Sequence, residues 1–361
     1  MDVLMPKYLT IADYIEAQIL NQTWLPNQQL PSEKEMMQQF QVSRQTIRNA
    51  LEYLSKKDLV YSEQGRGTFV SDSRRSSANP GNKNVALILG KLDSYIFPYK
   101  SVGINAVLTR NGYTSSVFAS NIRIDHQDQL IRNVLSGSYA GVIMEVAKAA
   151  LPRHNPELLE ELRSRMPVVL IDGYYRETDI PYVAIDDFNG GYMAAEHLIA
   201  KGHRRIFHVG MLDAIQGMLR YQGYARALTD HGIPLNDDLI YWCVEEDQNF
   251  MSEARLTEIC QKILSCTAVF FYNDLMTMRI LPTLLKMGVK IPDQLAVMGY
   301  DDSNQYIHGV PISSICYPKE RLGEKAAENL LHLIRNPEFD ANYLFQPVLI
   351  ERESTNLILK E

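Results

Sequence analysis

Short apolar runs alternate with amphipathic segments from residue 85 to the end of the chain. Runs of four or five apolar residues are typical of strands that a sheet buries on both faces. Six such runs predict strands at 85–89, 141–144, 168–171, 206–209, 268–271 and 295–298. Helical periodicity predicts helices between and after them, among others at 189–201, 254–264, 275–287 and 319–334. Strands and helices in alternation predict parallel sheets, and this length favours two sheets with a cleft between them.

The first 70 residues follow a different pattern, in which two short helices adjoin. Ser32 precedes an apolar stripe and Glu35 stands three residues later, which is the spacing of a capping box. After a short connection, Ser43 is placed to cap a second helix. That helix repeats apolar residues at i, i+3, i+4 and i+7 from Ile47 to Leu54. The sequence therefore predicts two helices that share a small core.

The second helix presents polar side chains away from that core, including Arg44, Gln45 and Arg48. Such a helix start offers hydrogen-bond donors to base edges and phosphates in a DNA groove. Alternating residues at 59–61 and 68–70 then predict a hairpin with a glycine-containing tip. Glycines at the tip let the backbone approach a duplex closely, so the hairpin is interpreted as a wing that reaches the minor groove.

The motifs of this region resemble the winged helix of the GntR family of bacterial regulators over about residues 5 to 71. They are Pro31-Ser32-Glu33, Val42-Ser43-Arg44, Thr46-Ile47-Arg48 and Gly65-Arg66-Gly67-Thr68-Phe69-Val70. The resemblance implies a double-stranded DNA operator as partner. The predicted DNA contacts are Glu33, Lys34, Ser43, Arg44, Gln45, Thr46, Arg48, Gln64, Gly65 and Arg66. For Glu33, contact with a cytosine amino group and a first-turn interaction with the helix dipole both stay open.

Charge and composition refine the domain division. Residues 1–80 hold nine Lys/Arg and nine Asp/Glu, but the stretch 39–75 holds seven basic and four acidic residues. DNA affinity should therefore depend on a local basic patch and on salt. Residues 71–84 (SDSRRSSANPGNKN) contain almost no apolar side chain and predict a flexible linker between domains 1–70 and 85–361.

Several classes of protein are disfavoured by the sequence. The chain has 361 residues, 46% hydrophobic and 22% charged, as expected of a globular protein with two or more domains. No stretch approaches the ~20 apolar residues of a membrane helix or has the form of a signal peptide, so we expect a cytoplasmic protein and no periplasmic carrier. The four cysteines form no CxxC pair and the histidines show no metal spacing. We expect no metal, no cofactor and, without a nucleophile or phosphate-loop motif, no enzyme.

Polar side chains follow several of the predicted strands directly, and ligands in such sheets bind beyond the carboxyl ends of the strands. They include Glu145, Asp172, Asn273-Asp274 and Tyr300-Asp301-Asp302. Carboxylates there can accept hydrogen bonds from hydroxyl groups. Asp and Asn also cap helices at strand-to-helix turns, so both interpretations stay open for each residue.

The second part of the chain resembles the effector domain of the LacI/GalR family over nearly all of residues 84–361. The motifs are Ile185 to Gly191, Lys201 to Ile206, Arg220 to Tyr224, Asn273-Asp274 and Ile291 to Asp302. The resemblance implies an α/β, periplasmic-binding-protein-like domain of two parallel-sheet subdomains, after the α+β winged helix. Their expected bounds are about 85–186 with 314–344, and 187–313 with 345–361. The effector-binding residues that the resemblance implies are Lys91, Tyr95, Phe97, Tyr99, Glu145, Arg220, Asn273 and Asp301. Asp172 is added to them because it directly follows a predicted strand.

A GntR-like head joined to a LacI/GalR-like effector domain resembles the arabinose repressors of Gram-positive bacteria. This implies a homodimer that binds a near-palindromic operator and releases it when L-arabinose binds. The chain departs from typical LacI/GalR proteins because a polar linker stands where they have a hinge helix. Ribose, a hexose, a purine or a sugar phosphate stay open as effectors, although repulsion by Glu145 and Asp301 disfavours a phosphate.

Overall fold

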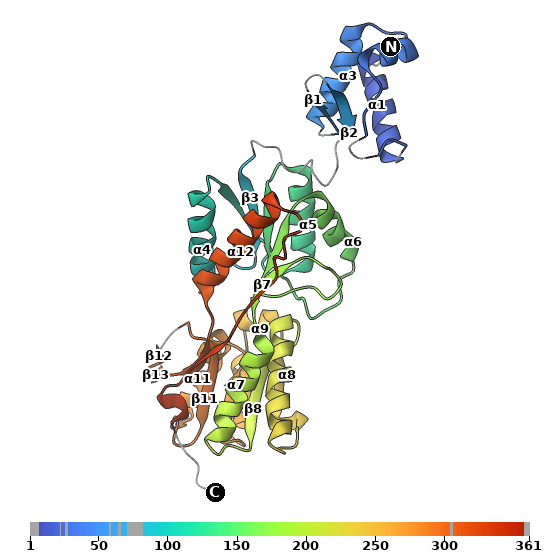
Figure 1. Cartoon of the computed structure of the whole chain (residues 1–361). Helices are drawn as coiled ribbons and strands as arrows, with labels where there is room; N and C mark the ends of the chain where they lie inside the picture. The colour runs from blue at the N-terminus through green and yellow to red at the C-terminus, as the bar shows by residue number, and fades with distance from the viewer. Residues whose placement is uncertain are drawn as a thin grey trace.

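The computed structural model describes residues 7–21, 23–25, 28–57, 59–63, 66–70, 82–303 and 306–356. Most of the predicted linker 71–84, and the predicted DNA contacts Gln64 and Gly65, lie outside the described residues. The described chain forms a small N-terminal domain and a larger domain with two sheets (Figure 1).

The N-terminal domain is a winged helix, as predicted. It contains α1 (Lys7–Leu20), α2 (Glu33–Phe40), α3 (Arg44–Lys56) and an antiparallel hairpin of β1 (Val60–Glu63) and β2 (Gly67–Val70). Ser32 and Glu35 form the predicted capping box at α2, and the Ser43 side chain caps α3. The turn between these helices is tight because Gln41 ends α2 in the left-handed conformation, with φ 51°. Buried residues of all three helices and both strands share one core.

The first sheet of the larger domain is entirely parallel, with strand order β15-β7-β6-β5-β3-β4. Its strands are β3 (Asn84–Leu89), β4 (Thr114–Ala119), β5 (Gly141–Glu145), β6 (Val168–Ile171), β7 (Tyr182–Ile185) and β15 (Tyr343–Phe345). Helices α4 (Phe97–Arg110) and α12 (Lys319–Arg335) cover one face, and α5 (Ile124–Ser136) and α6 (Pro156–Arg165) cover the other (Figure 1). Burial on both faces explains the continuous apolar run in β3.

The second sheet has the order β16-β14-β11-β10-β8-β9, parallel except for β16. Its strands are β8 (Ile206–Met211), β9 (Ile240–Cys243), β10 (Ala268–Phe271), β11 (Ala296–Asp301), β14 (Ser313–Cys316) and β16 (Val348–Ile350). Helices α7 (Asp187–Ala200) and α8 (Ile215–Asp230) lie side by side on one face, while α10 (Glu253–Ile263) and α11 (Asp274–Lys286) cover the other (Figure 1). Short elements complete it: α9 (Glu245–Asn249), β12 (Tyr306–Ile307), β13 (Val310–Pro311), and 3₁₀ turns at Asp237–Leu239 and Glu353–Thr355.

The chain passes between the two sheets three times. The first passage follows Ile185, the end of β7, close to the predicted boundary. The second follows Cys316, whereas the expected bounds put it after residue 313; β14 pairs with β11 and so belongs to the second sheet. The third follows Phe345 rather than 344, because β15 pairs with β7 in the first sheet. The second and third passages therefore follow the ends of β14 and β15.

Candidate functional site

The start of α3 is the first candidate site. Ser43 Oγ accepts the backbone N–H of Thr46 at 3.3 Å and lies 2.9 Å from the Thr46 hydroxyl. Arg44, Gln45 and Arg48 are exposed beyond this cap, as is Lys34 on the preceding helix. The structure thus brings these predicted DNA contacts to the surface of the two-helix unit.

Glu33 lies between the two arginines of α3. Its carboxylate is 2.5 Å from Nε of Arg44 and 3.1 Å from Nε of Arg48. The hydrogen bond from Arg44 is the main reason that the pKa of Glu33 is lowered, and Arg48 adds to it. Glu33 is also the first residue of α2, so it occupies the first-turn position that favours an acid. Its contact with both arginines was not predicted.

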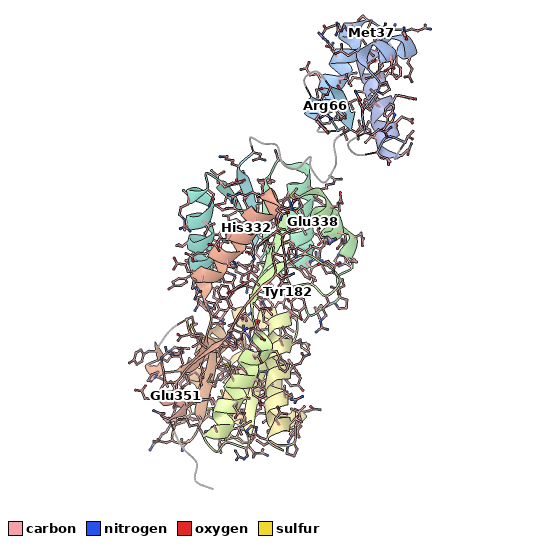
Figure 2. The ribbon with its side chains drawn as sticks, in the orientation of Figure 1. Met37, Arg66, Tyr182, His332, Glu338 and Glu351 are labelled. Atoms are coloured by element: carbon pink, nitrogen blue, oxygen red, sulfur yellow. The ribbon has the colours of Figure 1, made fainter. Side chains whose placement is uncertain are left out.

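The wing is described only in part. Arg66 is exposed beside the hairpin (Figure 2), and its guanidinium lies 5.8 Å from the ring centre of Phe69. Its backbone oxygen accepts a hydrogen bond from the Gln29 side chain at 2.7 Å, which ties the wing to the segment before α2.

The second candidate site is a cavity of about 120 Å³ between the two sheets. A water needs only roughly 10–15 Å³ by the same measure, so this cavity has room for a small organic ligand. It lies beyond the carboxyl ends of strands from both sheets, as predicted. Its polar or charged lining residues are Lys91, Ser94, Tyr95, Lys100, Glu145, Lys148, Asp172, Gln216, Arg220, Glu245, Gln248, Tyr272, Asn273, Asp301 and Tyr317.

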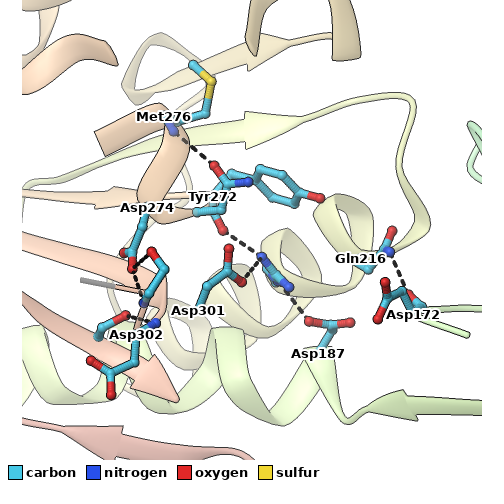
Figure 3. Close-up of polar contacts among 12 residues, drawn as sticks. Asp172, Asp187, Gln216, Tyr272, Asp274, Met276, Asp301 and Asp302 are labelled. Atoms are coloured by element: carbon cyan, nitrogen blue, oxygen red, sulfur yellow. Dashed lines mark hydrogen bonds and ion pairs between the residues drawn. The ribbon is translucent and has the colours of Figure 1, made fainter. Parts of the chain in front are cut away.

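Arg220 is the central cation on the side of the second sheet. Its Nε donates to Asp187 at 2.8 Å, and its Nη1 donates to the backbone oxygen of Tyr272 at 2.7 Å and lies 3.7 Å from Asp301. Asp187 and Asp301 flank this guanidinium (Figure 3), which also lies 3.5 Å from the ring centre of Tyr300. Burial raises the pKa of Asp187 to about 6, although Arg220 acts against that rise.

Asp301 connects the two halves of the cavity. The Tyr95 hydroxyl, from the loop after β3, donates to its carboxylate. Burial raises the pKa of Asp301 and that of Tyr95. Asp301 and Asp172 both have positive φ angles, 95° and 70°, which non-glycine residues adopt uncommonly. Such backbone strain often marks functional sites, and here it occurs at two carboxylates that line one cavity.

The amide of Asn273 has two roles in the structure. Its oxygen accepts the Met276 N–H at 2.9 Å and so caps α11, while its nitrogen donates to Gln248 at 3.2 Å within the cavity wall. The cap and the ligand interpretations are thus compatible at this residue. Asp274 does not line the cavity; it accepts hydrogen bonds from the backbone and hydroxyl of Ser303, both at 2.8 Å.

Ion pairs cross the mouth of the cavity between the subdomains. Lys91 lies 2.5 Å from Glu245. Lys148 lies 3.1 Å from Asp213 and 2.7 Å from Glu246. The subdomains therefore contact each other around the cavity through charged side chains.

Seven of the nine predicted effector residues line the cavity, and Phe97 and Tyr99 do not. Both lie in the first turn of α4, whereas Tyr95 lies in the loop before this helix. Phe97 packs against the main hydrophobic core, and Tyr99 is 52% exposed beside the start of α12. The cavity lining therefore does not include these two predicted effector residues.

The sequence reasoning missed several charged or polar lining residues. They are Lys100, Lys148, Gln216, Glu245, Gln248 and Tyr272. Burial of Lys100 could have been predicted from the sequence. It shares one helix face with Gly103, Ile104 and Val107, and an exposed lysine is not expected on such a face.

Two negative observations hold for the described part of the chain. No helix there is both long and apolar enough to cross a bilayer. Within the same residues, no three His, Cys, Asp or Glu side chains are grouped as metal ligands.

Comparisons with known proteins agree with both domains. Residues 7–70 match the family described as bacterial regulatory proteins, gntR family, and residues 195–355 match the periplasmic binding protein-like domain. An arabinose metabolism transcriptional repressor of Halalkalibacterium halodurans is 32% identical over 97% of this chain and 96% of that protein. One of Geobacillus stearothermophilus is 30% identical over 98% of this chain and 99% of that protein.

A solved structure supports the fold. The complex of the transcriptional regulator CelR with cellobiose has a TM-score of 0.66 and 24% identity, covering 87% of this chain and 92% of that one. A DNA-binding head and a two-sheet effector domain together define a ligand-responsive transcriptional regulator. Within that class, the near full-length similarity shows that the chain belongs to the family of arabinose metabolism transcriptional repressors.

Proposed function

We propose that the chain is a homodimeric repressor that binds a near-palindromic operator through α3 and the wing, and that L-arabinose in the cavity releases it. The single observation that carries this proposal is the cavity between the sheets, which draws hydrogen-bonding side chains from both subdomains. Membership of the arabinose metabolism repressors supports the choice of sugar.

The proposed roles follow from chemistry. Asp172, Glu145 and Asp301 accept hydrogen bonds from ring hydroxyls, while Arg220 and Asn273 donate to sugar oxygens. On DNA, Arg44 and Arg48 act as forked donors to guanine edges or phosphates, with Gln45, Thr46 and Lys34 beside them. Winged helix 1–70, linker 71–84 and effector domain 85–361 remain the proposed domain division.

Release requires that the sugar have different affinities for two arrangements of the subdomains. A ligand that contacts Asp301 and Glu145 at once bridges the two sheets and favours the arrangement in which they lie close. A coupling of about 1–3 kcal/mol between sugar and operator would change occupancy appreciably.

Release of the operator on addition of a sugar tests the proposal directly. Fluorescence anisotropy of a labelled operator duplex, at fixed salt, is followed as L-arabinose, D-ribose, a hexose, a purine or a sugar phosphate is added. Release by L-arabinose at the lowest concentration supports the proposal, and release by another compound alone contradicts the assignment of the sugar. An Arg220→Met variant that releases the operator at the parental sugar concentration would show that the cavity is not the sensor.

A further inference from the structure

We propose that Lys100 and Asp172 form a specificity-determining pair that restricts the cavity to uncharged polyhydroxylated ligands and excludes anionic ones. This inference rests on the proposed function, because it takes the cavity to be the effector site. It concerns the chemical class of ligand rather than the identity of the sugar.

Lys100 is a buried lysine held by two carboxylates. Its side chain is 3% exposed, and its ammonium donates to Asp172 and lies 3.1 Å from Glu145. Glu145 ends β5, and Asp172 follows β6, the strand that pairs with β5 in the first sheet. Burial alone would lower the pKa of Lys100, but Asp172 and Glu145 outweigh it and hold the pKa above its ordinary value. The lysine is therefore charged, and the three side chains together carry a net negative charge when both acids are ionised.

Asp172 retains an unused hydrogen-bond acceptor. One carboxylate oxygen bonds Lys100, whereas the other, Oδ1, is buried and accepts no hydrogen bond from the described residues. Gln216 holds the backbone oxygen of the same residue from the other subdomain (Figure 3). A buried acceptor without a partner is costly, so a ligand that supplies a donor gains affinity there. A hydroxyl group supplies that donor, and a carboxylate or phosphate dianion does not.

The remaining cations of the cavity are also engaged by acids. Lys91 pairs with Glu245. Lys148 pairs with two carboxylates, as does Arg220. Each lysine or arginine among the described lining residues therefore has a carboxylate partner. An anionic ligand would meet like charge without a free cation to receive it, and such repulsion is an effective way to reject a wrong ligand.

Asp172→Asn is the informative change because it frees Lys100 from one carboxylate while keeping the side-chain shape. Lys100 and Glu145 then form a neutral pair, and the cavity gains a partly available ammonium. Lys100→Met/Asp172→Asn removes one positive and one negative charge, leaves Glu145 charged, and so restores the original net charge. Lys83→Met is the control: Lys83 is an exposed lysine at the end of the linker, directly before β3.

Three sugars with the same ring stereochemistry serve as probes. L-Arabinose, D-fucose and D-galacturonate differ at one ring carbon, which carries hydrogen, methyl and carboxylate respectively. Binding is measured by calorimetry on the full chain at about pH 8, because burial raises the pKa of Asp172 to about 7 and its carboxylate must be ionised in the test. We expect the parent and Lys83→Met to bind both neutral sugars and to bind D-galacturonate much more weakly than D-fucose.

For Asp172→Asn we expect the ratio of D-galacturonate affinity to D-fucose affinity to rise at least about tenfold. In the double variant this ratio should return to the parental value. A purely structural role would weaken all three sugars alike and leave the ratio unchanged.

The inference is overturned if the parent binds D-galacturonate as tightly as D-fucose, if Asp172→Asn leaves the ratio unchanged, or if the parent binds neither neutral sugar. Operator release by L-arabinose is measured on the same samples. Release together with an unchanged ratio refutes the Lys100–Asp172 inference and leaves the proposed function intact. Altered ratios without release refute the proposed function and leave the selectivity of the cavity intact.

Discussion

Replacing Arg220 by methionine should destabilise the effector domain strongly, because this arginine is the buried partner of two carboxylates. The side chains of Arg220 and Asp187 are 4% and 2% exposed, and Asp301 is similarly buried. Breaking a buried ion pair by removing one partner costs about 3–5 kcal/mol, since the other charge is left without compensation. Methionine keeps the packing of the stem, so the loss should come mainly from the two acids.

Arg226→Met is the control, on the same helix α8. Arg226 pairs with Asp230 at 2.9 Å, but the side chains are 63% and 33% exposed. An exposed pair of this kind contributes little to stability, because solvent screens both charges. The structure therefore predicts that Arg220→Met destabilises the domain far more than Arg226→Met, although the two positions are six residues apart on the same helix.

The assay is urea unfolding at about pH 8, followed by tryptophan emission. The chain has two tryptophans, and Trp242 lies in the second subdomain with its ring centre 4.9 Å from that of Tyr221. A Trp24→Phe background leaves Trp242 as the reporter of this subdomain. Adding Asp187→Asn to Arg220→Met should recover part of the loss, because one uncompensated charge disappears. Equal destabilisation by Arg220→Met and Arg226→Met, or no recovery in the double variant, would refute the reasoning.

Three further changes have distinct expected outcomes. Arg44→Ala should weaken operator binding by about 1–3 kcal/mol in anisotropy titrations at fixed salt and relax base preference, whereas unaltered binding would contradict its role at a base edge. Gly191→Ala should lower the thermal midpoint, at a cost of about 1–3 kcal/mol or more, because its Cβ would lie 2.1 Å from the Arg220 carbonyl oxygen. Burial lowers the pKa of His208 to about 3, so the stability that the neutral ring contributes is complete above about pH 6.5 and is lost as pH falls toward 3. His208→Leu should therefore flatten the fall in urea midpoint across that pH range, and an unchanged slope would show that another group controls it.

The sequence predicted the central strands well because burial on both faces makes them continuously apolar. β5, β6 and β10 lie inside their sheets and appear as unbroken runs. The edge strand β4 (TSSVFA) was missed because it is partly exposed and carries threonine and serine. β15 has three residues, and its membership of the first sheet depends on pairing with β7, far away in sequence. No local pattern contains that information.

The part of the cavity lining that comes from the carboxyl ends of strands could be predicted from the sequence. Glu145, Asp172 and Asp301 follow apolar runs directly, so the rule that ligands bind at carboxyl ends placed them correctly. Phe97 does not line the cavity because the loop after β3 becomes a helix there, and its side chain packs against the core. Lys100 was missed because its two partners come from neighbouring strands, and their proximity depends on the order of the sheet.

Two of the three passages between the sheets are connected to residues of the cavity, which offers a physical route from ligand binding to subdomain movement. Asp187 begins the helix after the first passage and bonds Arg220, and Tyr317 in the second passage lines the cavity itself. Lys319, which begins α12 after the second passage, donates to the backbone oxygen of Asp301. A ligand that contacts Arg220 and Asp301 therefore binds the side chains that anchor two of the three passages. Tyr95 and Asp301 belong to different subdomains, so a ligand that contacts both would bind differently to different arrangements of the subdomains; such differential affinity is what coupling to DNA requires.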